Sequence, residues 1–188
     1  IKDHFATVPY FAEESRNLEA YLHAGGKLVM IGSNIMQSFM DESYYLIAPC
    51  EPCIVYPAKF SSSGWNWFMN KILHVNFGYI GNLIGNFNSA DGINGYAGIQ
   101  LRPDTTKIAN VFPQYNKLSN VDVIIEPGGF TVPILKLNSD DDYVDQEECV
   151  IRYYGSGFDV IYIGAPIWHM QSEDAKILGD KILEDMGF

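Results

Sequence analysis

The residues best suited to covalent catalysis are a serine in the first third of the chain and a histidine near its end. Ser33 follows an apolar run and a glycine in the stretch Gly25–Asn34, a pattern typical of a buried strand and a sharp turn. The nucleophile elbow of α/β hydrolases requires glycine two residues before and two after the serine. Ile31 and Ile35 stand there instead. The pattern therefore favours Ser33 as a helix N-cap, and a nucleophile assisted by His169 is the alternative.

Cys50 and Cys53 form a C-x-x-C pair, which is compatible with a redox centre, half a zinc site or a local disulfide. A thioredoxin-like centre needs the pair at the start of a helix, whereas prolines around this pair indicate an extended loop. A zinc site would need two further ligands, such as Cys149 and a histidine. We expect a loop disulfide between Cys50 and Cys53 or two free thiols, with metal binding as the alternative.

An acidic run at residues 138–145 offers Asp140, Asp142 and Asp145 as oxygen ligands for calcium. The run lacks the glycine and glutamate spacing of an EF-hand loop. We therefore expect a solvated charged loop and no metal or other cofactor, and calcium binding is the alternative.

Aromatic residues make up 14% of the chain. Several lie in or beside the Gly/Asn-rich region at about 75–120, namely Trp65, Trp67, Tyr79, Tyr96 and Tyr115. Buried packing is the usual role of such side chains, and stacking on sugar rings is the alternative.

The bulk composition limits the classes of function. The 188 residues suffice for one domain, and 47% hydrophobic with 19% charged residues describe a globular chain. A net charge of -11 argues against nucleic-acid binding, and no apolar run approaches the roughly 20 residues of a transmembrane helix. The sequence starts at Ile1 without signal-peptide features, so we expect a single domain, 1–188, that is a piece of a longer or processed protein.

The apolar periodicity predicts helices alternating with strands. Ser15 is expected to cap a helix that ends at Gly25 and Gly26, and a buried strand follows at 28–31. A second helix is expected at 65–73, before an irregular Gly/Asn-rich insertion at about 75–120. The later elements are four strands and a closing helix, at 121–126, 132–137, 149–154, 159–164 and 172–186.

Four segments together resemble the class I glutamine-amidotransferase-like α/β domains of large secreted bacterial proteins. They read NLEAYLHAGGKLVMIGSN, FMNKILHVNF, VDVIIEPGGFTVPILKL and DVIYIGAPIWHMQSEDAKILGDKILEDMGF. The resemblance implies a layered, mostly parallel flavodoxin-like sheet with helices on both faces. In such sheets ligands bind at the carboxyl ends of the strands. The expected pocket rim is Gly32, Ser33, Asn34, Pro166 and His169.

The catalytic triad of that family is not retained. Its cysteine, histidine and glutamate positions fall at Gly32, Ala165 and Ile167, and only Pro166 is kept. Glycine cannot attack a carbonyl, and alanine cannot transfer a proton. The resemblance therefore implies a degenerate, non-catalytic site.

The sequence thus predicts a non-catalytic accessory or interaction domain of a larger exported bacterial protein. Its expected location is extracellular or at the cell surface. Its expected partners are other domains of the parent protein, an extracellular protein or a glycan. Two alternatives remain: a serine hydrolase using Ser33, His169 and a carboxylate such as Asp159 or Glu173, and a carbohydrate-binding module.

Overall fold

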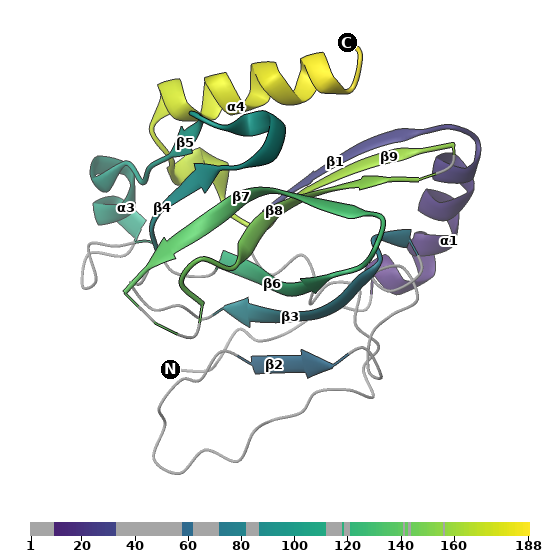
Figure 1. Ribbon diagram of the computed structural model, residues 1–188, viewed down its shortest axis with the longest axis horizontal. Helices are drawn as coiled ribbons and strands as arrows, with labels where there is room; N and C mark the ends of the chain where they lie inside the picture. Colours follow the sequence, from purple (N-terminus) through teal and green to yellow (C-terminus); the bar gives the residue numbers. More distant parts are fainter. Residues whose placement is uncertain are drawn as a thin grey trace.

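The computed structural model describes residues 10–32, 58–61, 72–81, 87–111, 118, 121–140, 142, 144–155 and 157–188. Nine strands form one curled sheet, in the order β2-β3-β6-β8-β7-β4-β5, with β9 beside β8 and β1 beside β9 (Figure 1). The strands are β1 Lys27–Ile31, β2 Ala58–Ser61, β3 Val75–Gly81, β4 Phe87–Gly92, β5 Gln100–Leu101, β6 Val121–Pro127, β7 Thr131–Ser139, β8 Glu148–Tyr154 and β9 Asp159–Ile163. The helices are α1 Tyr10–His23, α3 Thr105–Val111 and α4 Ser172–Asp185, with the 3-10 turns η4 Asn94–Tyr96 and η5 Ile167–His169.

The sheet is mostly antiparallel, so the prediction of a mostly parallel sheet is wrong for the described strands. Only β1 and β9 run parallel, with Val29 opposite Ile161. The other pairs are antiparallel. The physical reason lies in the connections, since the link from β8 to β9 is only residues 155–158. A parallel crossover needs a dozen or more residues, so a short link makes a hairpin.

Helices cover both faces of the sheet around β1 and β9, as predicted. Side chains alternate along these strands, so successive residues enter two different apolar clusters. One cluster includes α1 and contains Leu22, Met30, Val160 and Tyr162. The other includes α4 and contains Ile161, Ile163, Leu178 and Ile182, with Val29 packed against it. In Figure 1 α4 runs along one side of the sheet and α1 lies below β1 and β9.

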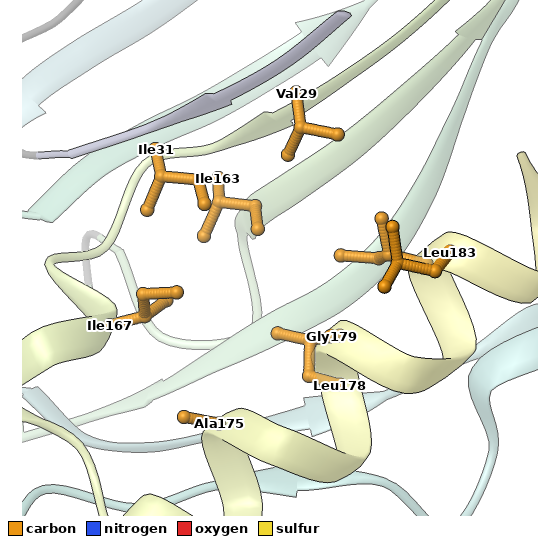
Figure 2. A pocket seen from close by; sticks show the side chains of 9 residues that line it. Val29, Ile31, Ile163, Ile167, Ala175, Leu178, Gly179 and Leu183 are labelled. Atoms are coloured by element: carbon orange, nitrogen blue, oxygen red, sulfur yellow. The ribbon is translucent and has the colours of Figure 1, made fainter. Parts of the chain in front are cut away.

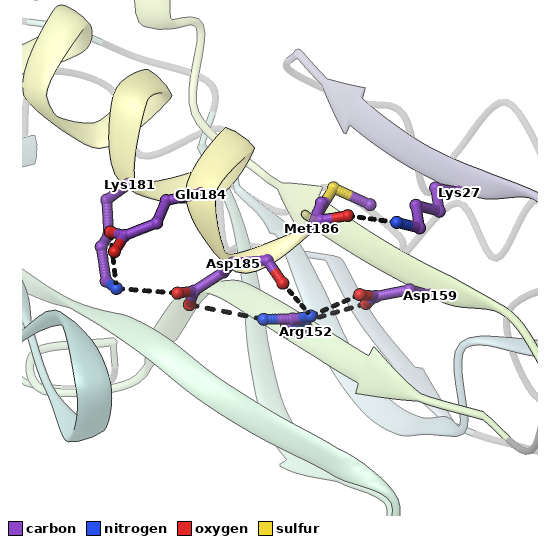
Figure 3. Close-up of polar contacts among 7 residues, drawn as sticks. All are labelled: Lys27, Arg152, Asp159, Lys181, Glu184, Asp185 and Met186. Carbon is purple, nitrogen blue, oxygen red and sulfur yellow. Dashed lines mark hydrogen bonds and ion pairs between the residues drawn. The ribbon is translucent and has the colours of Figure 1, made fainter. Parts of the chain in front are cut away.

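Arg152 on β8 fastens the C-terminal turn of α4 to the sheet (Figure 3). Its buried guanidinium forms a two-point contact with the Asp159 carboxylate, including an Nε–Oδ1 bond of 2.9 Å. It also donates to the Asp185 carbonyl (2.9 Å) and lies 3.3 Å from the Asp185 carboxylate. Lys181 reaches the same carboxylate at 2.7 Å. Positive charge at a helix C-terminus is favourable, so these contacts also suit the helix dipole.

Arg102, just after β5, fastens the other end of α4. Its guanidinium binds both carboxylate oxygens of Asp174 at 2.7 and 2.8 Å, and its backbone N–H donates to the same carboxylate at 3.0 Å. Asp174 is buried in the first turn of the helix. The Arg102 guanidinium lowers the pKa of Asp174 below its ordinary value.

The carboxyl end of β9 passes very close to β6. The Asp122 N–H donates to the Gly164 carbonyl at 2.7 Å, and a Cβ at Gly164 would lie 2.4 Å from the Asp122 carbonyl oxygen. The Tyr162 hydroxyl donates to the Asp122 carboxylate, and both side chains are fully buried. Glycine is therefore required at position 164 for this approach.

Most of the predicted elements are confirmed, namely the strands at 28–31, 121–126, 132–137, 149–154 and 159–164 and the closing helix. The first helix begins at Tyr10, so the prediction of Ser15 as its cap is wrong. The sequence predicts an irregular region with short strands at about 75–120, and the described part of that region contributes β3, β4 and β5 to the sheet. The expected helix at 65–73 lies almost wholly outside the described residues.

None of the described helices combines the length and the apolar character that crossing a bilayer requires.

Replacing Arg152 by alanine should lower the free energy of unfolding by about 1–3 kcal/mol, because the half-buried carboxylates of Asp159 and Asp185 lose their contacts with the guanidinium. Urea denaturation followed by circular dichroism measures this change. The matched control is Lys176→Ala, which removes the exposed Lys176–Asp180 pair and should change stability little. Equal effects of the two substitutions would contradict the role given to Arg152.

The Arg102–Asp174 ion pair should make the free energy of unfolding depend on pH in the acidic range. Because the folded-state pKa of Asp174 is lowered, its contribution is fully present above the ordinary value of 3.8 and is lost as the pH falls through the lower folded value. Asp174→Asn should cost about 1–3 kcal/mol at neutral pH. In urea titrations, the difference from the unaltered protein should shrink below about pH 4. A difference that stays constant into strong acid would contradict this.

Candidate binding site: an apolar groove between β1 and α4

An apolar groove lies between the edge of the sheet and α4, with a cavity volume of about 260 Å³ (Figure 2). Strands β1 and β9 and the turn η5 supply one wall, and α4 supplies the other. The lining residues are Val29, Ile31, Ile163, Ile167, Ala175, Leu178, Gly179, Ile182 and Leu183. Every lining side chain is apolar, so the groove can bind hydrocarbon but offers no acid, base or nucleophile.

The local sequence explains why the groove is there. Alternation along β1 places Val29 and Ile31 on the same face as α4. Along α4, Ala175, Gly179 and Leu183 recur every fourth residue and therefore form one stripe. The two small residues leave space between helix and sheet. Among the residues that the structure describes, no atom would lie within 4 Å of a Cβ added at Gly179.

The groove is open to solvent along the edge of the sheet. Ile31 is 38% exposed and Leu183 is 49% exposed. Among the strands that the structure describes, β1 pairs only with β9, so one side of β1 carries no neighbour. Tyr21 covers one end of this edge, since its hydroxyl donates to the Lys27 carbonyl at 2.9 Å and accepts from the Lys27 N–H at 3.2 Å.

A second hollow of about 450 Å³, with both apolar and polar lining residues, adjoins the groove near Ile167 and Ala175. The groove and this hollow share Ile167 and Ala175, and the hollow adds Lys107, Trp168, Met170, Ser172 and Lys176. Lys107 Nζ donates to the Met170 carbonyl (2.6 Å) and to Ser172 Oγ (3.1 Å). Trp168 is 56% exposed. The combined surface is thus apolar along most of its length and cationic at one end.

His169, the predicted base, lies on η5 next to this hollow but does not line it. Its backbone carbonyl accepts from the Asp104 N–H at 2.8 Å. Burial lowers the pKa of His169 below its ordinary 6.5, and the positive charge of Lys107 lowers it further.

Gly32 and Pro166, two residues of the predicted pocket rim, do not line the groove, but their sequence neighbours do. Gly32 and Pro166 are buried, and the Gly32 N–H donates to the Ile163 carbonyl at 3.1 Å. Their neighbours Ile31 and Ile167 line the groove instead. Ile167 is the position that the family resemblance assigns to the catalytic glutamate, and Ala165, assigned to the histidine, is fully buried. Ser33 and Asn34 lie outside the described residues.

Asp159 is wrong as a partner for His169. It lies at the opposite end of β9, where it binds Arg152. The five-residue strand alone separates that end from Ile163 by about 13 Å at 3.3 Å per residue. Glu173 is exposed in the first turn of α4.

The metal and cysteine alternatives find no support in the described residues. Within that part of the chain, no three His, Cys, Asp or Glu side chains gather around a possible ion. Asp140 accepts from the Asn88 amide at 2.7 Å, and Asp145 accepts from the Ser139 N–H at 2.8 Å. Cys149 is free and fully buried, and burial raises the pKa of its thiol to about 12. Cys50 and Cys53 lie outside the described residues, as does part of the acidic run.

Tyr96 is wrong as a platform for sugar stacking, because it is 3% exposed and packs in the core beneath α4. Burial raises the pKa of its hydroxyl, and the Asp185 carboxylate raises it further. The side chain of Tyr79 and all of Tyr115, Trp65 and Trp67 lie outside the described part of the chain.

No family model, curated protein or solved structure matches the chain. The resemblance to glutamine-amidotransferase-like domains therefore stays a prediction.

The sequence pattern places Ala175, Leu178, Ile182 and Leu183 on one side of the closing helix, which is the side that lines the groove. The pattern missed Gly179. The available signal was a glycine in the middle of an otherwise favourable helix, where it costs about 1 kcal/mol relative to alanine. A glycine that costs helix stability at this position indicates a role in tertiary packing or binding rather than in the helix itself.

Gly179→Ala should raise the free energy of unfolding by about 0.5–1 kcal/mol, because alanine favours the helix and its Cβ meets open space. Thermal and urea denaturation measure the change. Gly164→Ala is the contrasting substitution and should be destabilising, because its Cβ would clash with the Asp122 carbonyl. A loss of stability in Gly179→Ala would show that the groove is filled by this chain.

Proposed function

We propose that this protein is a non-catalytic accessory or interaction domain that binds its partner through the groove between β1 and α4. One observation carries the proposal, namely a solvent-open groove with a wholly apolar lining. Apolar patches left open to water mark binding sites in soluble proteins. Binding of an apolar group would cover Ile31 and Leu183 and recover the free energy that their exposure costs.

The composition of the site supports a binding role over a catalytic one. The positions that correspond to the family's cysteine, histidine and glutamate are Gly32, Ala165 and Ile167. The last of them contributes a hydrocarbon side chain to the groove where the enzyme family has a carboxylate. The proposal is thus a degenerate amidotransferase-like site in which apolar contact replaces chemistry.

The arrangement of β1 and β9 supports a kinship with layered, flavodoxin-like α/β domains. The two strands are parallel, and each face of the pair is covered by a helix, α1 or α4. With the resemblance stated above, this favours a module of a larger exported bacterial protein, acting outside the cell or at its surface. Other domains of that protein are the first candidates for partners.

The neutral dye Nile red tests the groove as a binding surface. The unaltered protein should bind the dye with increased fluorescence, because its apolar rings fit a groove of this lining. Gly179→Leu should abolish that binding by filling the groove, whereas Gly179→Ala should retain it. Circular dichroism confirms that both variants are folded. Equal dye binding by both variants would contradict the proposal.

A serine-directed fluorophosphonate probe and assays with ester, amide and glutamine substrates test for catalysis. The proposal expects no adduct at Ser33 and no turnover. A Ser33 adduct that disappears in His169→Gln would favour the hydrolase alternative.

A further inference from the structure

We propose that the groove and the adjoining hollow together form a site for a single-chain amphiphile with an anionic head, of the class of medium- or long-chain carboxylates. This inference rests on the proposed binding function of the groove and adds the chemical class of the ligand. The hydrocarbon chain lies against β1 and α4, and the carboxylate lies at the Lys107 and Lys176 end.

Continuity of the two surfaces is the first argument. The apolar groove and the cationic hollow share Ile167 and Ala175, so the two surfaces adjoin at these residues. Along α4 the stripe from Ala175 to Leu183 spans about 12 Å at 1.5 Å per residue. A site with this shape suits a narrow chain, and the missing side chain at Gly179 gives that chain room near its middle.

Charge complementarity fixes the direction of the chain. Lys107 and Lys176 both line the hollow, whereas the groove is lined by hydrocarbon alone. Lys107 donates to the Met170 carbonyl and to Ser172 Oγ, and its ammonium forms an ion pair with Asp104 at 3.6 Å. Lys176 pairs with Asp180 at the surface, where both side chains are about two-thirds exposed. Such an exposed pair exchanges readily for another anion.

The hollow also offers an uncharged contact to the region where head and chain meet. Trp168 is 56% exposed there, and an indole ring combines an apolar body with a polar N–H. Ser172 adds a hydroxyl beside Lys107. Three features therefore indicate the ligand class. The groove is lined by hydrocarbon, and the adjoining hollow is lined by an indole ring and by two ammonium groups.

Displacement of Nile red from the full chain, with calorimetry as a second measure, tests the proposal. The probes are octanoate, decanoate and dodecanoate below their micellar concentrations, with decanol and decyltrimethylammonium as neutral and cationic heads on the same chain. Affinity should rise with chain length by up to about fourfold per buried methylene. Decanoate should bind about three- to tenfold more tightly than decanol, and decyltrimethylammonium should bind more weakly than either.

Two charge reversals test the head position. Lys176→Glu should weaken decanoate binding about three- to tenfold and leave decanol binding unchanged. Lys136→Glu, a reversal on β7 outside both hollows, is the matched control and should leave both unchanged. Gly179→Leu should abolish binding of every chain.

The outcomes separate this inference from the proposed function. If decanol binds as tightly as decanoate, or if Lys176→Glu and Lys136→Glu behave alike, the anionic ligand is overturned while the apolar groove stands. If Nile red binds the unaltered protein and Gly179→Leu equally, the groove itself fails as a binding site and both proposals fall.

Discussion

Two arginine clamps hold the two ends of α4, and the groove lies along the part of the helix between them. Arg102 binds Asp174 in the first turn, and Arg152 binds Asp185 in the last. Between them Leu178 and Ile182 enter the core, while the neighbouring stripe carries Ala175 and Gly179. The helix is therefore fixed in position, but on the β1 side its small side chains do not reach the strand. The remaining space is apolar and open.

This arrangement separates stability from binding. The clamps and the core lie on the inner side of α4, so the outer stripe is free to serve a ligand without weakening the fold. Gly179 illustrates the separation, because no atom of the described chain approaches the place of its missing Cβ. Gly164 is the opposite case, since backbone atoms of β6 fill that place. The fold requires glycine at position 164, whereas Gly179 leaves space beside the groove.

The ends of β1 and β9 place apolar side chains beside the groove. The parallel strands β1 and β9 end side by side, as they do at many α/β active sites. Here the residues that face outward from those ends are Ile31 and Ile167, and the buried Ala165 and Pro166 fill the space behind them. Only hydrocarbon is presented to a ligand. Such a position favours binding by burial of apolar surface.

The sequence by itself determined the local elements. Alternation and apolar runs predicted β1 and β6 to β9, and apolar periodicity predicted α4, because these signals depend on neighbours within a few residues. The direction of the strands was decided by tertiary structure, since pairing joins residues far apart in the chain. The same holds for the site: residues 31, 167 and 179 meet only after β1, η5 and α4 have packed. Charge balance between Arg152, Asp159 and Asp185 is likewise a property of the folded state, because no sequence spacing indicates that their side chains converge.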